Sequence, residues 1–196
     1  MSNTSRPRKT QAQRRAESRN AVLESALKLF GERGYESTSL EDIAADCGLT
    51  IRPIYHYFGN KKALFAAAND VMEQRLLDSM SEEAGQAARE NWSAFLDLCD
   101  DPGFRQIVLL DSPNVLGRDR WPTSPVMLKA RAAVGADPAS DDPAAPNTAL
   151  FSRVIMSALA EIALYIAESE NSKAARRESE ELIASLFQIL RTQKRS

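Results

Sequence analysis

Residues 47–62, CGLTIRPIYHYFGNKK, constrain the fold of this chain more than any other stretch. Gly48 ends one helical pattern, and the Thr50 hydroxyl can cap a short second helix that we expect to run from Ile51 to Phe58. Ile54 lies four residues before Phe58, so both face one side of that helix. The other side is crowded with polar and aromatic groups that have no partner in the nearby sequence. The pattern therefore indicates a helix whose outer face meets another molecule.

A pair of cations follows at the start of the next predicted helix. Asn60 can cap this helix, and its first residues are Lys61 and Lys62. Positive side chains are unfavourable there, because a helix N-terminus already carries positive partial charge. A phosphate group would reverse this penalty, since the free backbone N–H groups and the lysines both attract anions.

Together with the preceding TSLEDIAAD, this stretch resembles the helix-turn-helix of the tetracycline-repressor (TetR) family of bacterial regulators. The matching residues are Thr38, Ser39, Ile43, Ala44, Gly48, Leu49, Thr50, Ile54, Tyr55, Tyr57, Phe58 and Lys61. The chain departs from the family pattern at Cys47, where Ala is usual, and at Arg52-Pro53, where Gly and a small or polar residue are common. Pro53 would be the third helical residue, where its missing N–H is not needed.

The resemblance implies an all-α fold of about nine helices, with an N-terminal three-helix helix-turn-helix domain and a C-terminal helical domain for ligand binding and dimerisation. We place a flexible basic arm at residues 1–13, the DNA-binding domain at 14–62 and the regulatory domain at 63–196. The arm either contacts DNA or remains a solvated tail.

The resemblance also implies which residues contact DNA. Those at the start of the recognition helix would approach base edges in the major groove, and the aromatic residues after them would bind phosphates or thymine methyl groups. Arg52 has the fork that pairs with guanine O6 and N7, although a phosphate contact remains open as its alternative. The predicted DNA-binding residues are Thr38, Ser39, Thr50, Ile51, Arg52, Pro53, Tyr55, His56, Tyr57 and Lys61.

The charge distribution favours the same division. Residues 1–62 contain 11 Lys or Arg against 7 Asp or Glu, whereas the rest of the chain contains 14 against 20. A basic first third indicates that only the N-terminal part of the chain binds nucleic acid.

Cys47 and Cys99 lack the spacing of a metal site or a redox pair, so we expect reduced thiols and neither metal nor cofactor. A cytoplasmic protein is expected, because no apolar run reaches the roughly 18 residues that span a bilayer.

Beyond the helix that starts at Lys61, the chain predicts further helices with polar segments between them. Asp101-Pro102 begins one, and residues 111–117, DSPNVLG, predict a one-turn helix capped by Ser112 with Pro113 at its first position. With Arg120-Trp121, this segment is similar to one found in a subgroup of TetR-type regulatory domains. A helix is predicted from Ser124 to about Val134, and residues 136–146 predict a mobile loop.

Two long helices are predicted at the end of the sequence, one capped by Asn147 or Thr148 and one beginning after Asn171-Ser172. Their apolar residues cover more of the circumference than one core needs, which indicates a four-helix dimer interface of the kind this family uses. A wholly internal core is the alternative. The predicted interface residues are Leu150, Val154, Ile162, Ile166, Leu182, Leu186, Phe187 and Leu190.

The function that the resemblance implies is a ligand-responsive transcriptional regulator: a homodimer that represses by binding a near-palindromic operator and that a small apolar effector releases. A ligand-blind dimer that binds DNA or a protein is the alternative. An enzyme is disfavoured, because the single His56 has no carboxylate or cysteine partner within sequence reach. Residues that line the effector pocket, or that are simply core, are Phe95, Leu98, Phe104, Ile107, Leu116, Trp121, Met127, Met156 and Leu159.

Overall fold

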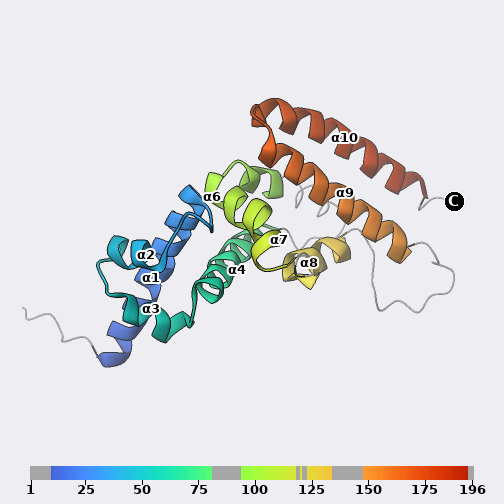
Figure 1. The fold of residues 1–196 in the computed structure, drawn as a ribbon. Coiled ribbons are helices and arrows are strands. Elements are labelled where there is room, and N and C mark those ends of the chain that lie inside the picture. The colour runs from blue at the N-terminus through green and yellow to red at the C-terminus, as the bar shows by residue number, and fades with distance from the viewer. Residues whose placement is uncertain (1–9, 81–93, 118–119, 121–122, 134–147, 194–196) are drawn as a thin grey trace, which may run out of the picture.

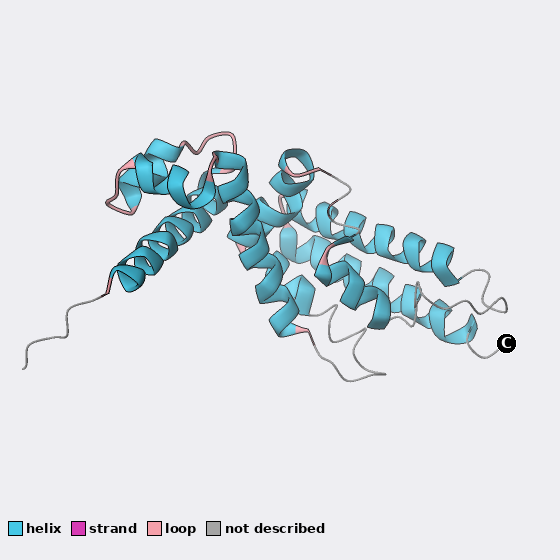
Figure 2. Cartoon of the chain, turned by 90° about the horizontal axis from the view of Figure 1, so that it is seen from below, coloured by secondary structure: helices cyan, strands magenta, loops and turns pink. Residues whose placement is uncertain are grey.

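The computed structural model describes residues 10–80, 94–117, 120, 123–133 and 148–193, without the side chains of parts of the last three helices. The described residues form helices joined by turns, which confirms the all-α prediction (Figure 2). Figure 1 shows a head made of α1 (Gln11–Arg33), α2 (Leu40–Asp46) and α3 (Ile51–Phe58). From this head α4 (Lys61–Ser79) runs into a body that contains the remaining helices.

Helix α1 begins earlier than we predicted. Thr10 Oγ1 accepts the Gln13 N–H at 3.2 Å, and Gln13 Oε1 accepts the Thr10 N–H at 2.8 Å. This capping box starts the helix at Gln11, before residue 14, where we placed the start of the DNA-binding domain, and it was overlooked in the sequence because no apolar residue follows it closely. Residues 11–13, which we placed in the arm, are therefore helical, and residues 1–9 lie outside the described part of the chain.

One apolar core runs from the head into the body. Phe30 of α1 and Phe65 of α4 meet edge to face, with ring centroids 5.2 Å apart. Tyr35, just after α1, packs against both rings. Core members in the head and the first part of α4 are Val22, Ala26, Leu29, Phe30, Leu40, Ile43, Ile54, Leu64 and Phe65, and the same cluster includes Phe104, Ile107 and Val108 of the body. The head is thus packed directly on the body.

The body surrounds α4. Residues 94–99 are helical, and α6 (Pro102–Phe104), the π-helix η1 (Arg105–Asp111) and α7 (Ser112–Val115) then follow one another without a break. Helix α8 (Pro125–Ala133) packs on α4 and α9. The last two helices, α9 (Thr148–Glu168) and α10 (Ser172–Gln193), lie side by side at the end farthest from the head (Figure 1).

The segment 111–117 is not the separate capped helix that we predicted. Ser112, expected as its cap, is already helical and donates its N–H to Ile107 O, five residues back. Asp101 does cap α6, because its Oδ1 accepts the Phe104 N–H at 2.8 Å. Helix α7 therefore continues from η1, and the proline that we read as the start of a new helix lies inside a continuous one.

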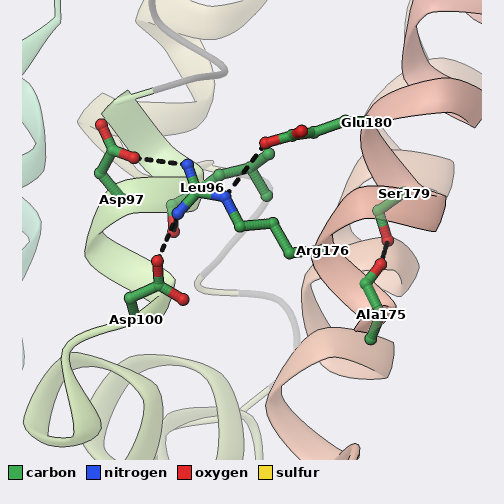
Figure 3. A network of polar contacts seen from close by, with 7 residues as sticks. All are labelled: Leu96, Asp97, Asp100, Ala175, Arg176, Ser179 and Glu180. Carbon is green, nitrogen blue, oxygen red and sulfur yellow. Dashed lines mark hydrogen bonds and ion pairs between the residues drawn. The ribbon is translucent and has the colours of Figure 1, made fainter. Parts of the chain in front are cut away.

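Arg176 of α10 joins the terminal helix pair to residues 94–100 (Figure 3). Its guanidinium donates to Asp97 Oδ1 at 2.5 Å, to Asp100 Oδ2 and to Glu180 Oε1 at 3.0 Å. The hydrogen bond that Arg176 donates to Asp97, together with the other two carboxylates, raises the pKa of Arg176 above its usual value. This network supplements the apolar contacts that hold α10 on α9.

Both cysteines are free thiols in the structure. Cys47 is half-buried, and the burial of Cys99 raises the pKa of its thiol to about 12. Among the described helices, none combines the length and the apolar composition that crossing a bilayer requires.

Candidate nucleic-acid interface

Helix α3 presents polar side chains to solvent from its N-terminal end. Thr50 is its N-cap in an extended conformation (φ −83°, ψ 165°), yet the Thr50 hydroxyl makes no capping hydrogen bond. Arg52 and His56 are exposed, and Tyr55 is 52% exposed. Ile51, Pro53 and Tyr57 are half-buried beside them. The structure thus gathers the predicted α3 residues on one accessible surface.

The inner side of α3 is fixed on the head. Ile54 is completely buried, and Phe58 packs against the core from the edge. The Arg19 guanidinium of α1 lies 5.1 Å from the centre of the Phe58 ring, within cation–π range. Gly48, with φ 67°, makes the turn that brings α3 across α2. The exposed side chains therefore stand on a rigid support.

Thr38 and Ser39, predicted to contact DNA, are engaged inside the head. Thr38 is 1% exposed, and its hydroxyl donates to Gly34 O at 2.8 Å. The Asp42 N–H donates to Ser39 Oγ at 3.0 Å, while the Ser39 N–H and hydroxyl donate to Asp42 Oδ2 at 2.9 and 2.6 Å. The prediction is corrected at Thr38, which is a buried structural residue. Ser39 is half-buried and its side chain forms the cap of α2, so its contact with DNA stays a prediction.

The N-terminus of α2 already holds an anion. Hydrogen bonds from Ser39 keep the pKa of Asp42 below its usual value, so this carboxylate remains charged. The Glu41 side chain is exposed beside it. A DNA phosphate approaching this helix end would meet two carboxylates, which makes α2 a weaker phosphate site than its position alone suggests.

Asp46 braces α2 against α1, a role that sequence reasoning missed. It accepts the Lys28 ammonium at 2.6 Å and the Ser25 hydroxyl at 2.8 Å. The hydrogen bond from Lys28, followed by that from Ser25, lowers the pKa of Asp46. The sequence alone does not predict that these three residues meet, because their contact depends on how the two helices cross.

Lys61 has an aromatic partner that the sequence did not reveal. Its Nζ lies 4.2 Å from the centre of the Tyr35 ring. Asn60 Oδ1 accepts the Ala63 N–H at 2.8 Å, so α4 begins where it was predicted. Lys61 and Tyr55 line a surface hollow of about 390 Å³ together with the first residues of α2. The cation–π contact holds the Lys61 charge at this edge of the head.

Further cations lie on the N-terminal half of α1. Arg14, Arg15 and Arg19 are exposed, and the first turn of the helix contains no acidic residue. This half of α1 adds positive charge to the end of the molecule that carries α3.

The predicted effector residues that the structure describes belong to the body core. Phe104 and Ile107 are completely buried, and the Phe95 ring centroid lies 6.1 Å from that of Phe104. Met127 is also buried, while Leu98 and Leu116 are half-buried. Trp121 and the side chains of Met156 and Leu159 lie outside the described residues.

A polar cluster on α4 accompanies this core and was not predicted. Asn69 is completely buried and donates from Nδ2 to Glu73 Oε1 at 2.7 Å. Arg120 approaches the same oxygen to 3.9 Å and also pairs with Asp70. Burial raises the pKa of Glu73. The core of the body is therefore less uniformly apolar than its sequence suggests.

The residues predicted for the dimer interface divide into two groups. Val154 is 56% and Leu182 is 52% exposed. Ile162 and Ile166 are 7% and 0% exposed, so we correct these two, which are buried in the core of their own chain. The sequence did not separate the groups because α9 is apolar on most sides. The side chains of Leu150, Leu186, Phe187 and Leu190 lie outside the described residues.

A head with a supported recognition helix and a helical body define the class of DNA-binding regulators with a helix-turn-helix. The sequence matches two models of the TetR group: the bacterial regulatory proteins of the tetR family over residues 22–68, and the tetracyclin repressor-like C-terminal domain over residues 85–190. The chain belongs to the TetR family of bacterial transcriptional regulators.

Solved structures and curated relatives are consistent with this family. A TetR-family regulator from Pectobacterium atrosepticum is 31% identical, over 93% of this chain and 97% of that one, with a TM-score of 0.64. BioQ, solved with its double-stranded DNA operator, has a TM-score of 0.59 at 17% identity over 86% of this chain and 95% of BioQ, and so shares the fold. The transcriptional repressor ComR of Escherichia coli is 44% identical over 52 residues, which are 26% of this chain and 25% of ComR. The chain thus spans about a quarter of this curated relative.

Proposed function

We propose that the protein is a homodimeric cytoplasmic repressor that binds a near-palindromic operator and is released by a small apolar effector. It acts by binding and not by catalysis. The observation that carries this proposal is the exposed row of Thr50, Arg52, Tyr55 and His56 on a helix that Ile54 fixes to the head. A helix supported in this way can enter the major groove without losing its packing.

The arrangement of charge supports binding to DNA at this end. Arg14, Arg15 and Arg19 flank one side of the head, and Lys61 and Lys62 flank the start of α4. These side chains can neutralise backbone phosphates while α3 reads bases. Thr38 is no longer part of the proposed contact surface, because it is buried.

The apolar body supports the remaining parts of the proposal. The exposed Val154 and Leu182 on the terminal helix pair favour contact with a second copy. The aromatic and aliphatic core around Phe95 and Phe104 favours an apolar effector.

The experiment that tests the proposal is selection of bound sequences from a random duplex pool at physiological salt. We expect recovery of a near-palindrome whose half-sites are separated by about one helical turn, as required when two recognition helices bind together. Recovery of sequences with a single half-site would contradict the dimeric arrangement. The same selection is run with the double variant Arg52→Ala, Tyr55→Ala. If the wild-type protein enriches no sequence more than this variant does, sequence-specific binding through α3 is contradicted.

A further inference from the structure

The continuous helix from Pro102 to Val115 changes its hydrogen-bond pattern in the middle. In η1 the bonds span five residues, as in the Ser112 N–H to Ile107 O bond, whereas Leu116 N–H donates to Ser112 O over four residues at 2.9 Å. Such a π turn accommodates one residue more than an α-helical turn, and π turns within α-helices are frequent at functional sites.

Pro113 provides a physical reason for the π turn. In a regular α-helix, residue 113 would donate an N–H to Leu109 O, which proline cannot do, and its ring would clash with that carbonyl. The wider turn just before Pro113 relieves this clash. The segment 111–117 thus contains the residue that sets the local register of the helix.

This register directs Asp111 toward the head. Asp111 Oδ2 accepts the backbone N–H of Tyr35 at 2.7 Å, where the chain turns from α1 toward α2. Gly34 suits this turn because its φ is positive. It is buried with φ 80°, and a Cβ at this position would lie 3.4 Å from Asp111 Oδ2 and 3.1 Å from Gln106 Nε2. We call the bond from Tyr35 to Asp111 the head clamp.

The head clamp lies beside a second close contact between head and body. A Cβ on Gly31 of α1 would lie 2.9 Å from the Cα of Gly103 in α6, so the two backbones touch without intervening side chains. The Tyr35 ring connects the head clamp to the predicted DNA surface, because Lys61 Nζ lies 4.2 Å from the centre of this ring. On its other sides η1 packs against α4 and α9. Figure 1 shows α6 and α7 between the head and the α9–α10 pair.

We propose that η1 is a two-state element whose π register closes the head clamp and whose α register opens it. Conversion to the α register turns the C-terminal end of η1, with Asp111, and the residues that follow it by about 100°, the rotation of one residue in an α-helix, and so withdraws Asp111 from Tyr35. Opening the clamp frees the turn that precedes α2 and loosens the support of Lys61. This inference rests on the proposed function, since the released head would hold the operator less well.

The test is amide hydrogen exchange at Tyr35 in the full chain. Pro113→Ala restores the missing N–H and favours the α register, whereas Asp111→Ala removes the acceptor directly. Each change should speed the exchange of Tyr35 by about tenfold, the effect of losing one hydrogen bond to a charged group. Because both act on the same bond, the double variant should exchange no faster than the faster single variant.

Two matched controls accompany these variants. Asp111→Asn keeps an acceptor oxygen and should retain slow exchange. Pro125→Ala removes the proline at the first position of α8, where no N–H is needed, and should leave Tyr35 unchanged. If Asp111→Ala does not fold, Pro113→Ala decides alone, since it deletes no side-chain hydrogen bond.

An unchanged Tyr35 exchange rate in folded Pro113→Ala would overturn the two-state element. The same holds if the double variant exchanges Tyr35 faster than either single variant, by the product of their two accelerations. Operator binding provides the second readout, and we expect both single variants to bind at least about fivefold more weakly. If the wild-type protein selects no duplex, the proposed function fails, but the exchange of Tyr35 still decides whether η1 controls the clamp.

Discussion

Arg52 lies at the exposed second position of α3, where its side chain has solvent on its outer side. Changing it to Ala should remove about 1 to 3 kcal/mol of discrimination at one base pair if its fork reads guanine. Changing it to Lys should lose part of this discrimination, because the planar fork is gone, but retain the salt dependence of binding, because the charge stays. Affinities for operators with single base changes test this. Equal losses on every operator in Arg52→Ala would assign Arg52 to phosphate.

Lys61 is expected to contribute charge without base preference. Lys61→Ala should weaken binding to all sequences alike and reduce the slope of log K against log salt by about 0.9, the value for one phosphate contact. It also removes the contact with the Tyr35 ring, so a small loss of thermal stability is expected. The neighbouring and exposed Lys62 provides the control: Lys62→Ala should leave thermal stability unchanged. A salt slope that stays at the wild-type value would exclude a phosphate contact by Lys61.

The predictability of single residues depended on whether their partners were local. Ile54 and Asn60 were assigned correctly, because helical spacing and capping are properties of neighbouring residues. Thr38 and Ser39 were both compatible with the cap of α2, and only the packed structure shows that Ser39 is the cap while Thr38 is buried. The Lys61–Tyr35 and Asp46–Lys28 contacts join distant segments, so no local pattern predicts them.

At the scale of elements, the crossing of α1 and α2 depends on an ionised Asp46. Its folded-state pKa is lowered, first by Lys28, so its contribution to stability is present above the usual aspartate value of 3.8 and is lost as the pH falls through the lower folded-state value. Asp46→Asn should therefore show less loss of Tm than wild type when the pH is lowered from 5 toward 2. Thermal melts of both proteins across this range measure the difference. Parallel curves would mean that other carboxylates dominate acid unfolding.

Helix α4 contains an acidic residue whose pKa is shifted in the opposite direction from that of Asp46. Glu73 is 5% exposed, and burial raises its pKa above the usual 4.5. A raised acid pKa favours the folded state at low pH, and this advantage is lost as the pH rises through the folded-state value. Glu73→Gln keeps an acceptor for Asn69 but removes the buried charge, so it should raise the Tm at pH 7 and have less effect near pH 4. Asp70→Asn, at a mostly exposed side chain, should not raise the Tm. A lower Tm for Glu73→Gln at pH 7 would show that the pairing with Arg120 outweighs desolvation.

Helix positions were largely readable from the sequence, whereas helix continuity was not. Caps at Asp101 and Asn60 and the glycine turn at Gly48 fixed the starts and ends of their helices. The pattern before Pro113 is compatible either with a break or with a widened turn, and the choice depends on Asp111 reaching Tyr35 across the head boundary. That contact spans 76 residues of sequence, so local reasoning placed a break there.

At the scale of the whole molecule, the exposed apolar face of the terminal helices determines whether two heads can act together. On α9, Val154 shares one face with Glu161 and Tyr165, and the Tyr165 hydroxyl donates to Glu178 of α10 at 3.1 Å. Leu182 is exposed farther along α10. Ile162 and Ile166 pack inward, so the surface available to a second copy is narrower than the apolar sequence of α9 suggested.

Val154→Asp combined with Leu182→Asp should convert the proposed dimer to a folded monomer, because four buried carboxylates would face each other across two copies. Sedimentation equilibrium measures the mass, and operator binding should fall strongly, since each head would then bind its half-site alone. Leu128→Asp is the matched control. Leu128 is 50% exposed on α8 and is not among the predicted interface residues, and its change adds one carboxylate per chain, against two in the double variant, without altering the oligomeric mass. A double variant that remains dimeric would place the interface on another face of the body. A wild-type protein that sediments as a monomer would contradict the proposed dimer, and with it the expectation of a near-palindromic operator.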